Sequence, residues 1–200
     1  SNSDHHNDFK IHYLPNGVNT DFFRPHSFEK SISALKLNPE KKYILFMDSY
    51  KRRTQKRVDR FHEVINKLLD KGNIYNIAPL ILTNTDRSLI PYYMSISALH
   101  LLTSDFEGSP NSVKECLACN TPIVSCPVGN VVDLIGDIDG CYVSESFKPK
   151  ELASLVLKCL ENESFIGRDK LLSKNIDINS VALKLKAIYK STIENGKQKK

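Results

Sequence analysis

Five short apolar runs, separated by segments with helical periodicity, are the feature that most constrains the fold of this chain. The runs are Tyr43–Met47, Ala78–Thr83, Leu99–Thr103, Pro122–Cys126 and Gly140–Val143. None of them alternates polar and apolar residues, so each is typical of a strand that is buried on both faces. Because buried strands that alternate with helices form parallel sheets, we expect an α/β fold: a Rossmann-like three-layer α/β/α domain with a mainly parallel sheet.

The helices between these runs are predicted from the spacing of apolar residues. One helix face is formed by Val58, Phe61, Val64, Ile65, Leu68 and Leu69, and Gly72 is a plausible stop. The same reading predicts helices at residues 58–69, 89–98, 111–119, 131–135, 149–160 and 181–193. Residues 161–180 follow no clear pattern and predict no definite element.

Length and composition indicate a soluble protein of about one domain. The chain has 200 residues, of which 40% are hydrophobic and 26% charged. There is no apolar run long enough for a transmembrane helix. The five cysteines are odd in number and irregularly spaced, which favours a reducing, cytoplasmic compartment. Cys116 and Cys119 have the spacing of a redox pair or of half a zinc site, but we expect them to pack as small apolar residues in a helix.

Three loops are expected at the carboxyl ends of the strands, where ligands bind in such sheets: residues 48–56, 83–88 and 104–111. The first loop begins a basic cluster made of Lys51, Arg52, Arg53, Lys56, Arg57 and Arg60. Clustered arginine and lysine side chains suit a phosphate group, although a solvated basic loop has the same composition. A nucleic-acid-binding module is a further reading of this cluster, weakened by the scarcity of aromatic residues beside it.

The third loop leads into the helix predicted at 111–119. Free N–H groups at a helix N-terminus favour an anion, and Ser109 and Asn111 are good capping residues beside Pro110. Glu107 and Glu115 lie on either side of this turn, and a carboxylate can accept hydrogen bonds from paired sugar hydroxyls. A nucleotide-sugar has hydroxyls at both ends and phosphates between them. The spacing taken alone is equally consistent with a turn residue and a surface helix residue.

Two blocks of sequence resemble a known family. The block FEGSPNSVKECLACNTPIV, in which seven residues separate Glu107 from Glu115, followed by Val128-Gly129, is similar to the E-x7-E region of glycosyltransferase family 4. The block LPNGVNTDFFRP at residues 14–25 resembles the interdomain segment of the same family. The resemblance covers residues 11–193 and is nearest in character to teichuronic acid biosynthesis glycosyltransferases.

This resemblance implies the C-terminal, donor-binding half of a GT-B enzyme, with an N-terminal acceptor-binding half absent from the chain. The domains expected are a tail and interdomain linker segment at 1–25, a nucleotide-sugar-binding domain at 26–180, and a C-terminal helix and basic tail at 181–200. The last helix would pack toward the other half and expose apolar surface here. The implied activity is a retaining sugar transfer from a UDP- or GDP-type donor to a saccharide or lipid-linked acceptor, in the cytoplasm or at the inner membrane face.

The family's residue roles are carried over by position. The catalytic group would be Glu107, Lys56 and Arg53, and the substrate-binding group Gly108, Ser109, Pro110, Asn111, Ser112, Glu115, Arg52, Thr83 and Asn84. No metal and no cofactor are expected, because cations and a helix N-terminus would neutralise the diphosphate. A non-catalytic nucleotide-sugar-binding module is the main alternative. A sugar epimerase would not be expected to have the E-x7-E block, and a phosphorylase would need a lysine for pyridoxal phosphate, for which no sequence context is evident.

The chain departs from the family pattern at several positions. Asp48-Ser49 and Lys56-Arg57 stand where Gly-Arg or Gly-Asn and Lys-Gly are usual, and Leu82-Thr83-Asn84-Thr85 replaces a GxGP turn. These changes leave the base and the phosphate-contacting arginine open. Asn120 replaces a glycine at a helix end, where asparagine tolerates a left-handed backbone.

Overall fold

A five-stranded sheet forms the centre of the protein. The computed structural model describes residues 11–48, 53–70, 72–162 and 164–198, with side chains described as far as residue 194. The strands are β1 (Lys42–Asp48), β2 (Ile77–Thr83), β3 (Ser97–Leu102), β4 (Ile123–Ser125) and β5 (Tyr142–Val143), in the spatial order β2-β1-β3-β4-β5. Every pairing between them is parallel, so the predicted fold class is confirmed.

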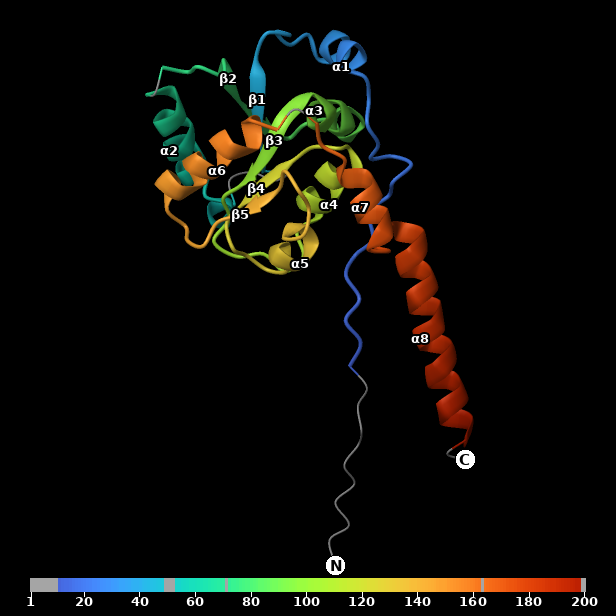
Figure 1. Cartoon of the computed structure of the whole chain (residues 1–200). Helices are drawn as coiled ribbons and strands as arrows, with labels where there is room; N and C mark the ends of the chain where they lie inside the picture. Colours follow the sequence, from blue (N-terminus) through green and yellow to red (C-terminus); the bar gives the residue numbers. More distant parts are fainter. Residues whose placement is uncertain (1–10, 49–52, 71, 163, 199–200) are drawn as a thin grey trace, which may run out of the picture.

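Helices cover both faces of this sheet (Figure 1). The helices are α1 (Phe28–Leu35), α2 (Val58–Leu69), α3 (Ile90–Ile96), α4 (Asn111–Ala118), α5 (Val131–Ile135), α6 (Pro149–Leu160), α7 (Gly167–Ser173) and α8 (Ile178–Gln198). The short 3-10 turns η1 (Thr54–Lys56) and η2 (Arg87–Leu89) precede α2 and α3. The predicted bounds of α2, α5 and α6 agree with the structure. These helices were predicted from the apolar side chains along one face, and that face is buried in the structure. In α2, for example, the buried residues include Phe61, Val64, Ile65 and Leu68.

The strand order places a topological switch point between β1 and β3. From β1 the chain runs outward to β2 and then returns to the other side of β1 as β3. The loops that leave the carboxyl ends of β1 and β3 therefore diverge toward helices on opposite faces, and a crevice opens between them. This crevice is where both glutamates of the predicted motif lie.

The boundary between α3 and β3 is the main error in the predicted elements. A helix was expected at 89–98 and a strand at 99–103, but the helix ends at Ile96 and the strand begins at Ser97. Ser97 pairs with Tyr43 of β1, and its hydroxyl donates to the carbonyl oxygen of Tyr93 in the last turn of α3. Pairing with a distant strand thus ends the helix early.

Two helices lack a predicted counterpart, and one is longer than expected. The short helices α1 and α7 were not predicted, the latter because residues 161–180 show no periodicity. Helix α8 begins at Ile178 rather than at residue 181, so its first turn precedes the proposed domain boundary. Asp177 begins this helix, since its carboxylate accepts hydrogen bonds from the amides of Asn179 and Ser180.

The segment that resembles an interdomain linker is docked on the domain. Val18 forms a parallel bridge with Asp177, and a Cβ on Gly17 would come within 2.6 Å of the Ile178 Cα. The guanidinium of Arg168 donates to the carbonyl oxygens of Thr20, Phe23 and Ala118. The linker, α4 and α7 are therefore held together by one side chain.

Helix α8 extends away from the domain and exposes apolar side chains along its length (Figure 1). Ile178, Leu183, Leu185, Tyr189 and Ile193 are exposed, which confirms the expectation of uncovered apolar surface on the last helix. None of the helices in the described ranges combines the length and apolar character that a membrane crossing requires.

The five cysteines are buried free thiols. Cys116 and Cys119 lie on α4 and at its end, inside the main hydrophobic core, as predicted for small apolar side chains. Burial raises the pKa of Cys119 to about 12, so this thiol is unreactive at neutral pH. Asn120, which follows, has φ 57° and so takes the left-handed conformation predicted for it.

Candidate functional site

An ion pair joins the loop after β1 to the loop after β3. The Lys56 ammonium lies 2.6 Å from Glu107 Oε1, and both side chains are more than four-fifths buried. Ser104 donates a second hydrogen bond, of 2.7 Å, to the same carboxylate oxygen. Two of the three residues predicted to be catalytic are therefore in direct contact across the switch point.

Lys56 is positioned through its backbone. It ends the 3-10 turn η1, and the hydroxyl of Thr103 donates to the carbonyl oxygens of Lys56 and Arg57 at 2.9 and 3.0 Å. The amide of Asp105 donates to the carbonyl oxygen of Gln55 at 2.8 Å. These contacts fix the lysine backbone against the end of β3, so the side chain enters the crevice from one defined point.

Two arginines of the basic cluster are already occupied by carboxylates. Arg57 pairs with Asp59 at 2.7 Å and with Asp105 at 3.0 Å, and Arg60 pairs with Asp105 at 2.7 Å. Arg60 also donates to the carbonyl oxygen of Thr103, and its side chain is almost fully buried. Hydrogen bonds from these arginines lower the pKa of Asp105, that from Arg60 most. These two side chains join the two loops, so they are not free for the phosphate contact that the composition of the basic cluster suggests.

Arg57 stands where the family pattern has glycine, and the backbone conformation at this position explains why glycine is preferred there. Its φ and ψ are 54° and 57°, in the left-handed region that glycine adopts without strain. The ion pairs with Asp59 and Asp105 give arginine a compensating interaction at this position.

The segment that follows β4 packs against the turn after Glu107 and supports it. The amide of Asn130 donates to the carbonyl oxygen of Gly108, and Gly129 has φ 54°. A Cβ on Gly129 would clash with the Gly108 carbonyl and lie 2.7 Å from the Glu107 carbonyl oxygen. A Cβ on Gly108 would meet nothing within 4 Å. The Val128-Gly129 segment thus supports the turn after Glu107, while the space beside Gly108 stays open.

Helix α4 presents its N-terminus to this open space. Pro110 takes the N-cap position, and no side chain caps the helix, so the expected caps by Ser109 or Asn111 are absent. Proline at the cap has no N–H group, and the helix amides beyond it are without a side-chain partner. An uncapped N-terminus of this kind can accept an anionic ligand group.

A cleft of about 360 Å³ lies along this N-terminus. Its lining brings together most of the predicted site residues: Arg53, Lys56, Glu107, Ser109, Pro110, Asn111, Ser112 and Glu115, together with Met47 and Arg87. Gly108 is exposed beside this lining but is not part of it. Arg52, also predicted to contact substrate, lies outside the described residues.

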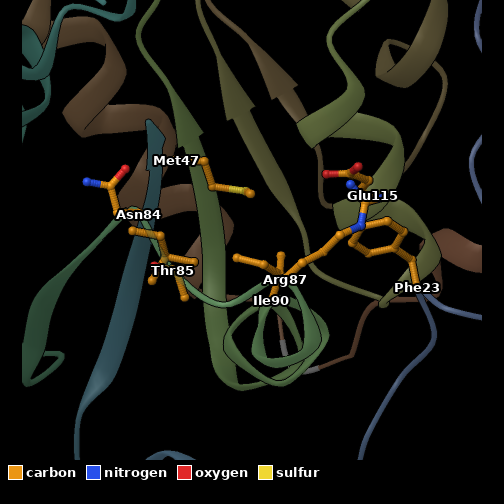
Figure 2. A pocket seen from close by; sticks show the side chains of 8 residues that line it. Phe23, Met47, Asn84, Thr85, Arg87, Ile90 and Glu115 are labelled. Carbon is orange, nitrogen blue, oxygen red and sulfur yellow. The ribbon is translucent and has the colours of Figure 1, made fainter. Parts of the chain in front are cut away.

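The cleft continues into a second hollow of about 260 Å³ at the end of β2 (Figure 2). Phe23, Met47, Leu82, Asn84, Thr85, Arg87, Ile90 and Glu115 line it. The predicted residue Asn84 is part of this lining, whereas Thr83 is exposed at the end of β2 and the neighbouring Thr85 faces the hollow instead. A third hollow of about 190 Å³ lies against the linker. Because Arg87 and Glu115 line all three, the hollows form one groove.

Arg87 is the main residue of this groove that the sequence analysis missed. Figure 2 shows its side chain reaching from η2 toward Glu115 and over Phe23. Its guanidinium lies 5.5 Å from the centre of the Phe22 ring and 5.8 Å from that of Phe23. Arg87 sits in the loop 83–88, which was expected at the ligand edge, so its position in the chain was an available signal.

Burial shifts the pKa of several ionisable groups around the first turns of α4, among them Glu115 and His100. Burial raises the pKa of Glu115, and the charges of Arg87 and Lys114 oppose that shift. Burial also lowers the pKa of His100, on β3, to about 4, so its ring is neutral at physiological pH. In the described part of the chain, no group of three or more His, Cys, Asp and Glu side chains is arranged to hold a metal ion.

Fold and site together define a doubly wound α/β domain with a polar groove at its switch point, bordered by cations and carboxylates. The chain belongs to the family described as Glycosyl transferases group 1, whose model matches residues 75–177, just over half of its length. No curated protein matches the chain.

Solved structures share the fold of this chain. Sucrose-phosphate synthase from Thermosynechococcus elongatus matches with a TM-score of 0.73 at 15% identity, covering 91% of this chain and 52% of that protein. HepE from Anabaena, in complex with UDP and glucose, matches with a TM-score of 0.68 at 14% identity, covering 89% and 56%. This chain thus spans about half of such relatives. The C-terminal domain of the group 1 glycosyl transferase LpcC from Francisella tularensis is covered completely, with a TM-score of 0.60, 17% identity and 81% of this chain.

Proposed function

We propose that this chain is the donor-binding domain of a retaining glycosyltransferase that takes a sugar from a nucleotide-sugar. The observation that carries the proposal is the groove itself. Lys56 and Arg53 line it beside the uncapped N-terminus of α4, and the two glutamates of the E-x7-E motif lie on either side of that N-terminus. A ligand with phosphates at its centre and hydroxyls at both ends has the matching chemistry.

In this proposal each end of the groove binds a different part of the donor. Glu107 accepts hydrogen bonds from hydroxyls of the transferred sugar, and Glu115 accepts them from the ribose. The base occupies the hollow lined by Asn84, Thr85 and Arg87. HepE was solved with UDP and glucose, which supports a nucleotide-sugar as the ligand class.

The chemical step breaks the bond between the anomeric carbon of the sugar and the diphosphate oxygen. Negative charge develops on the departing diphosphate, so groups that stabilise this charge lower the barrier. Lys56, Arg53 and the amides at the N-terminus of α4 supply that stabilisation in our proposal, with no metal ion and no cofactor. Lys56 must then exchange its contact with Glu107 for one with phosphate.

The acceptor is proposed to bind to a second domain. Since the chain spans about half of its solved relatives, an N-terminal half would complete the active-site cleft. A saccharide or lipid-linked acceptor in cell-surface polysaccharide synthesis, of the teichuronic acid type, fits the resemblance of the motif blocks. The reaction would take place in the cytoplasm or at the inner membrane face.

The test is to add UDP, GDP or ADP to the 200-residue chain and to measure the effect of each on its thermal unfolding. A ligand at 100 times its dissociation constant should stabilise the fold by about 2.7 kcal/mol. We expect stabilisation by one diphosphate, its loss in Glu115→Ala and no effect of EDTA. No stabilisation by any of the three would contradict the proposal. Steeply salt-dependent binding of RNA or DNA would instead favour the nucleic-acid reading.

A further inference from the structure

Two serines line the groove at the start of α4, and each contacts a different buried ionisable side chain. Ser109 lies in the turn before the helix, and Ser112 lies in its first turn. Lys114 contacts the first serine and His100 the second, and both of these residues are at most 1% exposed. Neither buried residue lines the groove, so each could act on a ligand only through its serine.

The contact with Lys114 fixes how the Ser109 hydroxyl can bond. The lysine ammonium donates to Ser109 Oγ at 3.3 Å and to the Asn16 carbonyl oxygen at 2.7 Å. An ammonium group has donors and no acceptor, so the serine must accept this bond with a lone pair. The proton of Ser109 therefore stays available for an acceptor in the groove.

The contact with His100 has the opposite consequence for Ser112. His100 Nδ1 lies 3.1 Å from the Leu45 carbonyl oxygen, which can only accept, so the proton of the neutral ring sits on Nδ1. The other ring nitrogen, Nε2, is then an acceptor, and it lies 3.2 Å from Ser112 Oγ. Ser112 donates its hydroxyl proton to this nitrogen, so only its lone pairs remain to accept a hydrogen bond from a ligand.

We propose that Lys114 is a positioning residue that keeps the Ser109 hydroxyl as a hydrogen-bond donor to a phosphate oxygen of a nucleoside diphosphate. A phosphate oxygen at neutral pH is a hydrogen-bond acceptor. It can therefore pair with the free proton of Ser109, but not with Ser112, which has only lone pairs to offer. The inference rests on the proposed function of the groove, and it adds the Ser109 hydroxyl to the phosphate contacts proposed for Lys56, Arg53 and the amides of α4. Ser112 is assigned instead to a ligand hydroxyl or N–H group.

The experiment measures dissociation constants by calorimetry for the nucleoside diphosphate that stabilises the chain and for its parent nucleoside. The variants are Ser109→Ala, Lys114→Met, their combination, Lys114→Arg, and Ser112→Ala as the matched control. Each is first checked for folding by circular dichroism. The quantity compared is the ratio of diphosphate to nucleoside affinity, because a general loss of stability does not change this ratio.

Ser109→Ala and Lys114→Met should each lower the affinity ratio about tenfold, the usual size for one hydrogen bond to a charged group. The double variant should lose no more than Ser109→Ala alone, since Lys114 acts through that hydroxyl. Lys114→Arg should retain most of the ratio, and Ser112→Ala should leave it within about twofold of wild type.

Three outcomes would overturn the inference while leaving the proposed function intact. They are an unchanged ratio in Lys114→Met, losses that add in the double variant, and a Ser112→Ala loss as large as that of Ser109→Ala. A wild-type chain that binds no nucleoside diphosphate would overturn the proposed function as well, so the two failures are distinguishable.

Discussion

The two glutamates of the motif lie in very different surroundings. The carboxylate of Glu107 is held by Lys56 and Ser104, and the backbone of its turn is supported by Gly129 and Asn130. The carboxylate of Glu115 has no hydrogen bond within the described residues, and burial raises its pKa. One glutamate is thus pre-organised by residues from distant loops, whereas the other is carried by a helix and left open.

This difference indicates how a ligand would be received at each end. At Glu107 a ligand must displace an existing ion pair, so binding there includes an exchange of partners for Lys56. At Glu115 the partly desolvated carboxylate gains hydrogen bonds without losing any, which makes ligand hydroxyls a favourable partner. Substitutions at the two ends should therefore differ in their effects on stability and on ligand binding.

Gly129→Ala should show that the Glu107 turn depends on backbone support. The new Cβ would clash with the Glu107 and Gly108 carbonyl groups, and a φ of 54° is unfavourable for alanine. We expect a loss of about 3 kcal/mol in the free energy of unfolding, measured with urea. Gly108→Ala is the matched control: its Cβ meets nothing within 4 Å, so stability should stay within about 0.5 kcal/mol while ligand affinity falls. Equal stability of the two variants would contradict this account.

Lys56→Met should weaken nucleoside diphosphate binding by about 2 kcal/mol, or roughly thirtyfold, because it removes a charged hydrogen-bond donor from the groove. Among the described residues, the Glu107 carboxylate then keeps one hydrogen-bond partner, the hydroxyl of Ser104. Isothermal titration calorimetry measures the affinity, and Lys67→Met, on the outer part of α2, serves as a control for loss of positive charge. Equal losses in both variants would mean that net charge, not position, determines binding.

Glu115→Gln should raise stability in a pH-dependent way. The pKa of Glu115 is raised in the folded protein, so its contribution is favourable below the unfolded pKa and is lost as pH rises through the folded value. The variant should therefore gain stability relative to wild type between about pH 4 and pH 7. Urea unfolding of both proteins across this range tests the sign, and a constant difference would show that burial does not strain this carboxylate.

Arg57→Gly should change stability by less than about 1 kcal/mol. Glycine relieves the left-handed strain but loses the ion pairs with Asp59 and Asp105, and exposed pairs contribute little. The Arg57 hydrogen bonds hold the pKa of Asp59 at about 2, so the lost contribution is present above pH 4 and disappears toward pH 2. A loss of several kcal/mol at pH 7 would mean that Arg57 is essential for joining the two loops.

Much of the fold was predictable because its signals are local. Unbroken apolar runs marked the strands, and the stripe from Phe61 to Leu68 gave the bounds of α2. The end of α3 was misplaced because the pairing of Ser97 with Tyr43, a contact between residues far apart in sequence, overrides helical propensity. Helix α7 was missed because residues 161–180 show no periodic pattern of apolar side chains.

The candidate site divides in the same way. The order of motif residues placed Glu107, Ser109, Asn111 and Glu115 around one helix start, and the structure brings them into one groove. The basic cluster carried no signal that Arg57 and Arg60 would pair with Asp105 while Lys56 turned into the groove. Arg87 was overlooked although its loop, residues 83–88, was expected at the ligand edge, because a single arginine in that loop forms no distinctive motif.

The order of the five strands along the chain could be predicted from the sequence, and with it the edge of the sheet where a ligand groove can form. Which charged side chains face that groove, and which pair within the protein, depends on the packing of the whole domain. The physical reason is that periodicity reports on the burial of neighbouring residues, whereas an ion pair or a hydrogen bond between loops depends on distances set by the packed sheet. The opposite bonding of Ser109 and Ser112, three residues apart, arises from Lys114 and His100 beneath them.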